Sequence, residues 1–232
     1  MSTDRWLLVG GLTILVAALI AGDLFLFNAT TTPPQPTPMS TPDTAPTAVT
    51  VGSDNLHTWS AEVSAATGIP ARAAQAYGQA QLALTSCHLT WNTLAGIAKV
   101  ESNNGTYGGA TLTDDGTATR PIIGAPLDGS AGNRLIPDTD HGALDGDPVH
   151  DRAVGPFQFL PQTWHAYAPP GANPQNIDAA ALAAGRYLCT GNRNLSTGRD
   201  WWAAVLSYNN SMSYAREVFA DTNSYAAAST SR

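Results

Sequence analysis

The stretch Leu94-Ala95-Gly96-Ile97-Ala98-Lys99-Val100-Glu101-Ser102-Asn103-Asn104-Gly105 has the pattern of an apolar helix that runs into an Asn/Gly stop. One face of this helix carries, at spacings of three, four and three residues, Trp91, Leu94, Ala98 and Glu101. A carboxyl group on a buried face is partly desolvated, which raises its pKa. Glu101 is therefore a candidate general acid, because a glutamic acid that stays protonated near neutral pH can donate a proton. The alternative is that Glu101 lies just off the buried face, in water.

The composition is that of a globular chain with few charges. Of the 232 residues, 43% are hydrophobic and 12% are charged, with a single lysine and a formal net charge of −7. Nucleic acids and anionic membrane surfaces select basic patches, so neither is expected as the main partner. The two cysteines, Cys87 and Cys189, do not form a C-x-x-C motif that would indicate a zinc or redox site.

The first 29 residues contain a segment typical of a membrane anchor or an export signal. Trp6 to Gly22 is a run of 17 residues without a charge, and residues 24–27 extend it beyond Asp23. A membrane-spanning helix needs about 20 residues. Arg5 before the run and Asp23 after it favour a cytoplasmic N-terminus. We expect an uncleaved single-pass anchor in the plasma membrane, with a cleaved signal peptide and secretion as the alternative. Both place the body of the protein outside the cytoplasm.

Residues 30–55 have the composition of an extended linker. Six prolines alternate with Thr and Ser, and large apolar residues are nearly absent, so the segment cannot bury enough surface to fold. Residues 56–225 are expected to form one mainly helical domain, and residues 226–232 a disordered tail. The expected helices cover residues 59–66, 70–86, 91–101 with Thr90 as the N-cap, 178–189, 199–208 and 213–220.

The stretch from Gly105 to Ala153 is predicted to form a small β or irregular insertion. Residues 120–123 and 134–136 are candidate strands of a short hairpin. An irregular segment of this length inside a compact domain is unusual unless it is functional. We therefore expect the insertion to build one wall of a substrate cleft.

Within the insertion, five aspartates are closely spaced: Asp138, Asp140, Asp145, Asp147 and Asp151. Such spacing suggests calcium, but in an EF-hand register counted from Asp138 the twelfth position is Val149 instead of Glu. We expect hydrogen bonds from the aspartates to the backbone, and ion pairs with Arg134 or Arg152, to close the loop without a metal. Calcium is the alternative, and the two flanking histidines lack the spacing of a zinc site. No cofactor is expected.

Two further stretches place polar residues at breaks in an apolar pattern. In Ala153–Trp164, Gln158 follows a Gly-Pro break and lies between two aromatic residues. Its amide can donate and accept hydrogen bonds, and aromatic rings pack on the faces of sugars. Ala203–Asn210 is an apolar helix that ends in three polar residues. Each stretch alone is more typical of a turn or a helix end than of a site.

Taken in order, these motifs resemble those of lytic murein transglycosylases in the lysozyme-like superfamily. The resemblance rests on Glu101-Ser102, Gly155-x-Phe157-Gln158 with Pro161, and Tyr208-Asn209. Residues 138–153 and 178–189 are similar to actinobacterial relatives of membrane-bound lytic transglycosylase B. The resemblance spans roughly residues 70–225. One departure is Phe157, where many members carry Met, and this change keeps an apolar wall.

The resemblance implies a helical domain of the goose-type lysozyme and lytic transglycosylase fold. Such enzymes cleave the β-1,4 bond between N-acetylmuramic acid and N-acetylglucosamine in peptidoglycan and leave a 1,6-anhydro ring. Glu101 would be the single catalytic acid/base, and Tyr208 would hydrogen-bond near it and orient it. Ser102 would support Glu101 or contact substrate, and substrate binding is also implied for Phe157, Gln158, Tyr208 and Asn209. The expected partners are glycan strands, bound by a monomer held at the membrane.

Two alternatives to this function remain open at this point. A muramidase would hydrolyse the same bond, and a wall-binding module would hold glycan strands without cutting them. A disulfide between Cys87 and Cys189 is predicted independently of the resemblance, because both lie near helix ends in a chain expected in an oxidising compartment.

Overall fold

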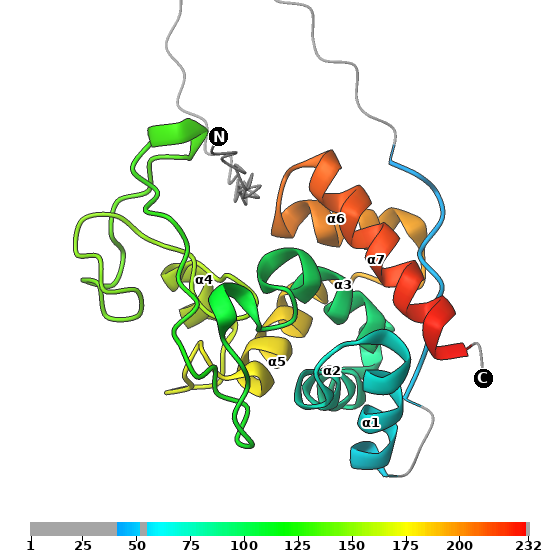
Figure 1. Cartoon of the computed structure of the whole chain (residues 1–232). Helices are drawn as coiled ribbons and strands as arrows, with labels where there is room; N and C mark the ends of the chain where they lie inside the picture. Colours follow the sequence, from blue (N-terminus) through cyan, green and yellow to red (C-terminus); the bar gives the residue numbers. More distant parts are fainter. Residues whose placement is uncertain (1–40, 52–54, 231–232) are drawn as a thin grey trace, which may run out of the picture.

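The structure is a computed structural model that describes residues 41–51 and 55–230, and it is mainly helical, as predicted (Figure 1). The predicted anchor, residues 1–29, lies outside the described residues. Within the described part of the chain, no helix is both long and apolar enough to cross a membrane. The helices are α1 (Leu56–Thr67), α2 (Ala71–Ala83), α3 (Trp91–Ser102), α4 (Pro161–Tyr167), α5 (Ile177–Leu188), α6 (Gly198–Tyr208) and α7 (Met212–Thr230), with 3₁₀ turns η1 (Thr85–Cys87), η2 (Tyr107–Gly109) and η3 (Ser130–Gly132).

Helix α3 is the central element, packed against α7 on one side and α2 on another. Its apolar residues are buried almost all round, which leaves Lys99 as its one exposed residue. Gly96 permits the close approach of α7, because a Cβ atom there would overlap the hydroxyl of Thr222 and lie 2.9 Å from the Val218 carbonyl oxygen. Any larger residue at position 96 would push α3 and α7 apart.

The predicted disulfide between Cys87 and Cys189 is present and joins η1 to the end of α5. The two cysteines are 102 positions apart in the sequence. In the chain-entropy model, closing a loop of about 100 residues stabilises the folded state by up to about 4.7 kcal/mol. The bridge fixes the turn that leads into α3.

The insertion contains isolated β-bridges, and the predicted pairing of residues 120–123 with 134–136 is wrong. Ile123 pairs with Val154, and Leu135 pairs with Asp128. The backbone of Ile136 bonds to two other segments. Its N–H donates to the Leu127 carbonyl at 2.8 Å, and its carbonyl accepts from the Asp151 N–H at 3.1 Å. The hairpin prediction paired segments by apolar content alone, whereas each segment finds its backbone partners elsewhere. In Figure 1 the insertion lies on the far side of α3 from α7.

The end of the predicted linker is part of the folded unit. Residues 43–51, here called the N-terminal strap, run beside α7 and are drawn in blue in Figure 1. The side chain of Asn92 in α3 is fully buried, donates to the Thr47 carbonyl at 2.8 Å and accepts from the Val49 N–H at 3.4 Å. In α6, the Trp202 indole N–H donates to the Thr44 carbonyl at 3.1 Å. The composition gave no sign of this docking, because it reports on side chains and the strap is held largely through its backbone.

Helix α7 runs to Thr230, past the predicted domain end at residue 225. Ala226, which was placed in the disordered tail, is 1% exposed. The alanines of this last stretch are good helix formers, and their small side chains give little hydrophobic signal.

We predict that a chain beginning at residue 56 is less stable than one beginning at residue 41. Removing the strap leaves the amide of Asn92 and the indole N–H of Trp202 with fewer partners. Each buried polar group left unpaired costs about 1–3 kcal/mol, so we expect the free energy of unfolding to fall by about 2–5 kcal/mol. Urea denaturation of both chains measures the difference. Equal stability would contradict the docking of the strap.

Candidate active site

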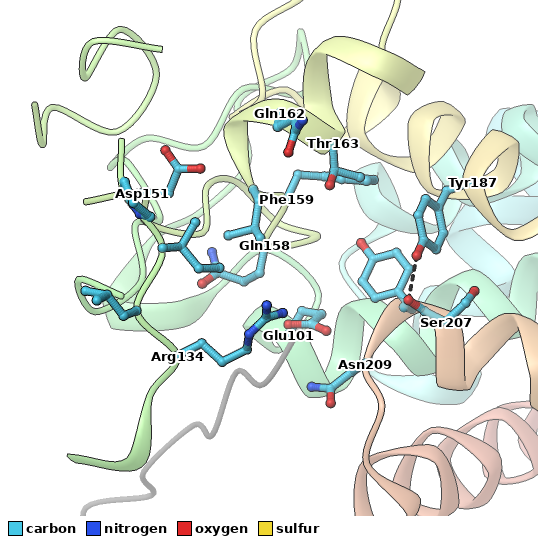
Figure 2. Close-up of a pocket in the computed structure, with 15 residues that line it drawn as sticks. Glu101, Arg134, Asp151, Gln158, Phe159, Gln162, Thr163, Tyr187, Ser207 and Asn209 are labelled. Atoms are coloured by element: carbon cyan, nitrogen blue, oxygen red, sulfur yellow. Dashed lines mark hydrogen bonds between the residues drawn. The ribbon is translucent and has the colours of Figure 1, made fainter. Parts of the chain in front are cut away.

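Glu101 lines a pocket of about 350 Å³ between the helices and the insertion (Figure 2). Side chains from α3, α4, α5 and α6 form one side: Glu101, Gln162, Thr163, Tyr187, Ser207 and Tyr208, with Asn209 directly after α6. The insertion and the segment before α4 form the other: Arg134, Leu135, Ile136, Pro137, Asp151, Gln158, Phe159 and Leu160. The insertion therefore forms one wall of the pocket, as predicted.

The carboxyl group of Glu101 is buried, with the residue 5% exposed. Burial raises the pKa of Glu101 from 4.5 to about 8, and a hydrogen bond from Tyr214 partly offsets this rise. The helical spacing thus predicted its burial correctly, and the alternative placement in water is wrong. At neutral pH the protonated form predominates, so Glu101 can donate a proton to a ligand in the pocket.

Tyr214, which the sequence analysis did not single out, is the hydrogen-bond partner of Glu101. Its hydroxyl donates to Glu101 Oε1 at 2.7 Å. The hydroxyl of Tyr208 donates instead to the Phe157 carbonyl at 2.6 Å, so the orienting bond expected from Tyr208 is wrong. Asn209 ends α6 in an extended conformation, and the first turn of α7 then brings Tyr214 back over Glu101. Tyr208 remains in the pocket wall.

A tight turn at Gly155–Gln158 is joined to α3 and α6, two of the helices that line the pocket. Ser102 of α3 donates its hydroxyl to the Pro156 carbonyl at 2.6 Å, and Tyr208 of α6 holds the next carbonyl. Gly155 has a φ of +77°, and a Cβ atom there would overlap the Pro174 carbonyl, so glycine is required on both counts. The turn presents Gln158 to the pocket.

Two predicted substrate-binding residues lie behind the pocket wall. Phe157 is fully buried and packs edge-on against Tyr77, with ring centroids 5.9 Å apart. Ser102 is 1% exposed, and its hydroxyl also accepts the Gly105 N–H at 2.9 Å. Both residues hold the turn and the end of α3 in place, which fits the supporting role that was one expectation for Ser102, and substrate contact by Phe157 stays a prediction.

Gln158 and Asn209 do line the pocket, as predicted, and each has features of a binding residue. Asn209 is 4% exposed, and its Oδ1 atom has no hydrogen-bond partner among the described residues. Such an acceptor is satisfied when a ligand supplies an N–H or O–H group. Gln158 adopts a φ of +48°, a conformation unusual for a residue with a side chain, and its amide donates to the Gly155 carbonyl at 2.9 Å.

The aspartate loop is closed largely as predicted, by hydrogen bonds from backbone N–H groups. Asp138 accepts from the Gly142 N–H at 3.0 Å, and Asp151 accepts from the N–H and hydroxyl of Thr139. Oxygens of Asp138, Asp140 and Asp151 lie within 4.8 Å of one another, so these three could hold a hard cation such as calcium. The expectation that the loop closes without a metal stays a prediction.

Asp151 lines the same pocket as Glu101 and was not expected to lie there. It is 1% exposed, and burial raises its pKa, while the bonds from Thr139 lower it. Figure 2 places it on the insertion side of the pocket, with Gln158 between it and Glu101. The sequence offered no signal that would separate Asp151 from the other aspartates of the loop.

Comparisons of the chain with protein-family models, curated proteins and solved structures find no match.

We predict that Glu101→Gln stabilises the protein at alkaline pH. The unfolded chain loses the Glu101 proton near pH 4.5 and the folded chain near pH 8, so the wild type loses about 1.4 kcal/mol of stability per pH unit between them. Gln keeps the shape and does not titrate. The gain in free energy of unfolding over wild type should therefore grow by about 3–4 kcal/mol from pH 5 to pH 8. Urea denaturation measures the free energy of unfolding of both proteins at both pH values. The same gain at pH 5 and at pH 8 would contradict a raised pKa of a buried Glu101.

We predict that Tyr214→Phe raises the pKa of Glu101 above about 8. The lost hydrogen bond favours the ionised carboxylate, so its removal leaves burial to act alone. In a pH profile of kcat/KM, the alkaline limb should move to higher pH, because the acid stays protonated for longer. Tyr208→Phe is the matched control, and it should leave that limb in place. A limb that moves to lower pH in Tyr214→Phe would contradict this assignment.

Proposed function

We propose that the protein is a lytic transglycosylase with a lysozyme-like fold that cleaves the bond between N-acetylmuramic acid and N-acetylglucosamine in peptidoglycan. The observation that carries the proposal is the buried, protonated Glu101 in the lining of a pocket. The substrate class is inferred from the order of the sequence motifs, which resembles that of lytic murein transglycosylases. With the anchor predicted at residues 1–29, the enzyme would act as a monomer outside the cytoplasm, in cell-wall remodelling.

In the proposed reaction Glu101 performs both proton transfers. It first donates its proton to the glycosidic oxygen, and the C1–O bond breaks while the 2-acetamido oxygen of the muramic acid stabilises the positive charge at C1. The Glu101 carboxylate then removes the proton from the C6 hydroxyl, whose oxygen bonds to C1 and closes the anhydro ring. Glu101 ends protonated again, and no water is consumed. A pKa of about 8 suits a group that must first be an acid and then a base.

The amides and aromatic rings of the pocket are suited to an amino sugar. Asn209 offers an unpartnered oxygen to an amide N–H or a hydroxyl group, and Gln158 carries a second amide. Tyr208 and Phe159 supply aromatic surface, with ring centroids 5.7 Å apart. Sugars present alternating polar and apolar faces, which this combination of amides and rings matches.

A hydrolytic muramidase is the second candidate, and Asp151 favours it. Hydrolytic glycosidases use a second carboxylate either to activate water or to attack the sugar. Asp151 lines the pocket and is a carboxylate of that kind. Against this role, the N–H and hydroxyl of Thr139 already occupy its two oxygens. These bonds favour a structural role in closing the aspartate loop.

We predict that digestion of purified peptidoglycan releases fragments with 1,6-anhydro ends. Mass spectrometry separates these from reducing ends, which are heavier by one water molecule. Glu101→Gln should lower the rate by at least about 10²–10⁴-fold, because it removes the general acid. Mainly reducing ends would favour the muramidase. Binding of glycan without soluble fragments would favour a wall-binding module.

Asp151→Asn separates the two enzymatic candidates. In a transglycosylase this variant should still release anhydro ends, at a rate that reflects any loss of order in the aspartate loop. In a muramidase it should abolish release, because the second carboxylate is gone. Thermal unfolding of the variant shows whether a loss of activity reflects a loss of fold.

A further inference from the structure

The edge of the pocket carries an exposed apolar surface that the proposed reaction does not use. Leu135 lines the pocket and is 63% exposed, more than any other large hydrophobic side chain in the described part of the chain. Ile136 and Pro137 follow it in the same lining, and the three residues are here called the apolar rim. Figure 2 shows the wall to which they belong, labelled there by Asp151, across the pocket from Tyr187.

The backbone holds the apolar rim in an extended and fixed conformation. Leu135 pairs with Asp128 and Pro137 pairs with His150, each in an antiparallel β-bridge. Side chains alternate along an extended chain, so Leu135 and Pro137 share one side. Both are exposed, whereas Ile136 between them is half-buried. A ligand that covers the rim therefore meets side chains whose backbone is already ordered, which lowers the entropy cost of binding.

A single exposed leucine is common on protein surfaces, and its place in the pocket is what distinguishes Leu135. Four other large hydrophobic side chains are exposed in the described part of the chain, and none of them lines the pocket: Leu82, Tyr107, Ile123 and Val149. Leu135 belongs to neither hydrophobic core cluster of the described residues. When a ligand covers its exposed surface, water is released, and the gain is roughly proportional to the apolar area buried.

The aliphatic character of the rim indicates which part of a glycan it fits. The flat faces of sugar rings match aromatic rings, which the pocket supplies at Tyr208 and Phe159. A branched leucine at the exposed edge matches instead the methyl groups of a flexible substituent. In peptidoglycan such a substituent is the stem peptide, which carries alanine methyl groups. It is joined to the lactyl group of muramic acid, on the same ring whose C1–O bond breaks in the proposed reaction.

We propose that the apolar rim binds the alanine-bearing part of the stem peptide and makes the protein selective for glycan strands that keep their peptides. This role rests on the proposed function. Leu135 is its specificity-determining residue, while Glu101 carries the chemistry. The contact depends on neither charge of the same wall, Arg134 or Asp151. It should therefore persist at high salt, because added ions screen charges and leave apolar contacts intact.

The test compares soluble strands that keep uncrosslinked peptides with the same strands after an amidase has removed the peptides. We measure kcat/KM on both for wild type, Leu135→Asn, Leu135→Met and Leu82→Asn, each as the full chain. Asn is close to Leu in size but polar, and Met keeps the apolar surface. Leu82 is the matched control, because it is 56% exposed in α2 and lies outside the pocket lining.

Two further measurements accompany the kinetics. Equilibrium binding of both kinds of strand is measured with the same four proteins, each carrying Glu101→Gln, so that the contact is observed without cleavage. Thermal unfolding verifies that each variant is folded.

We expect wild type to favour the peptide-bearing strands. Leu135→Asn should lower the ratio of kcat/KM on peptide-bearing strands to that on peptide-free strands by about three- to tenfold. The change should lie in KM, because a contact that is equal in the ground state and the transition state does not alter kcat. Leu135→Met and Leu82→Asn should keep the ratio of the wild type.

An unchanged ratio in Leu135→Asn would overturn the inference, and this includes an equal loss on both kinds of strand, which would place the contact on the glycan itself. Selectivity that disappears between about 0.1 M and about 1 M salt would assign it to charges and overturn the inference as well. If wild type cleaves neither kind of strand, the proposed enzymatic function fails, and the ratio of the two binding constants decides on the rim by the same criteria.

Discussion

The hydrogen bond from Tyr214 to Glu101 joins the end of α3 to the start of α7, and the surrounding structure keeps these two helices in register. Gly96 lets their backbones approach closely. The N-terminal strap crosses the same pair, because it bonds to Asn92 of α3 and to Asn223 of α7. The packing of α3 on α7, the lack of a side chain at Gly96 and the docked N-terminal strap therefore all help to fix the position of the Glu101 carboxyl group.

Burial keeps Glu101 protonated at neutral pH and also costs stability. A carboxyl group that resists ionisation inside the protein weakens the folded state at alkaline pH, since the unfolded chain ionises freely. The same resistance keeps a proton available at neutral pH. The elements around the site supply the compensating stability: the Cys87–Cys189 bridge before α3, the strap beside it, and the Gly155–Gln158 turn, which Ser102 and Tyr208 hold in place.

The sequence predicted those features that depend on local spacing. The helical period placed Glu101 on a buried face, and the helix starts near residues 91, 178 and 199 fall within a residue of the observed ones. Contacts between distant residues were harder to predict. Tyr214 lies 113 positions from its partner, and both Tyr208 and Tyr214 stood at polar helix ends without a signal to choose between them.

The direction of a side chain is hard to predict for a similar reason. Ser102 and Phe157 point into the core, and the sequence does not encode that direction locally. The strap was missed because hydrophobic content is a poor guide to a segment held by its backbone. One signal was present: Asn92, a polar residue in a helix that is buried almost all round, is where the strap binds.

The proposed chemistry depends on Glu101 being protonated, and infrared difference spectra of wild type against Glu101→Gln test this directly. We predict a carbonyl band of a protonated carboxyl group that belongs to Glu101, persists at pH 7 and disappears near pH 8. Loss of that band near pH 4.5 would contradict the account.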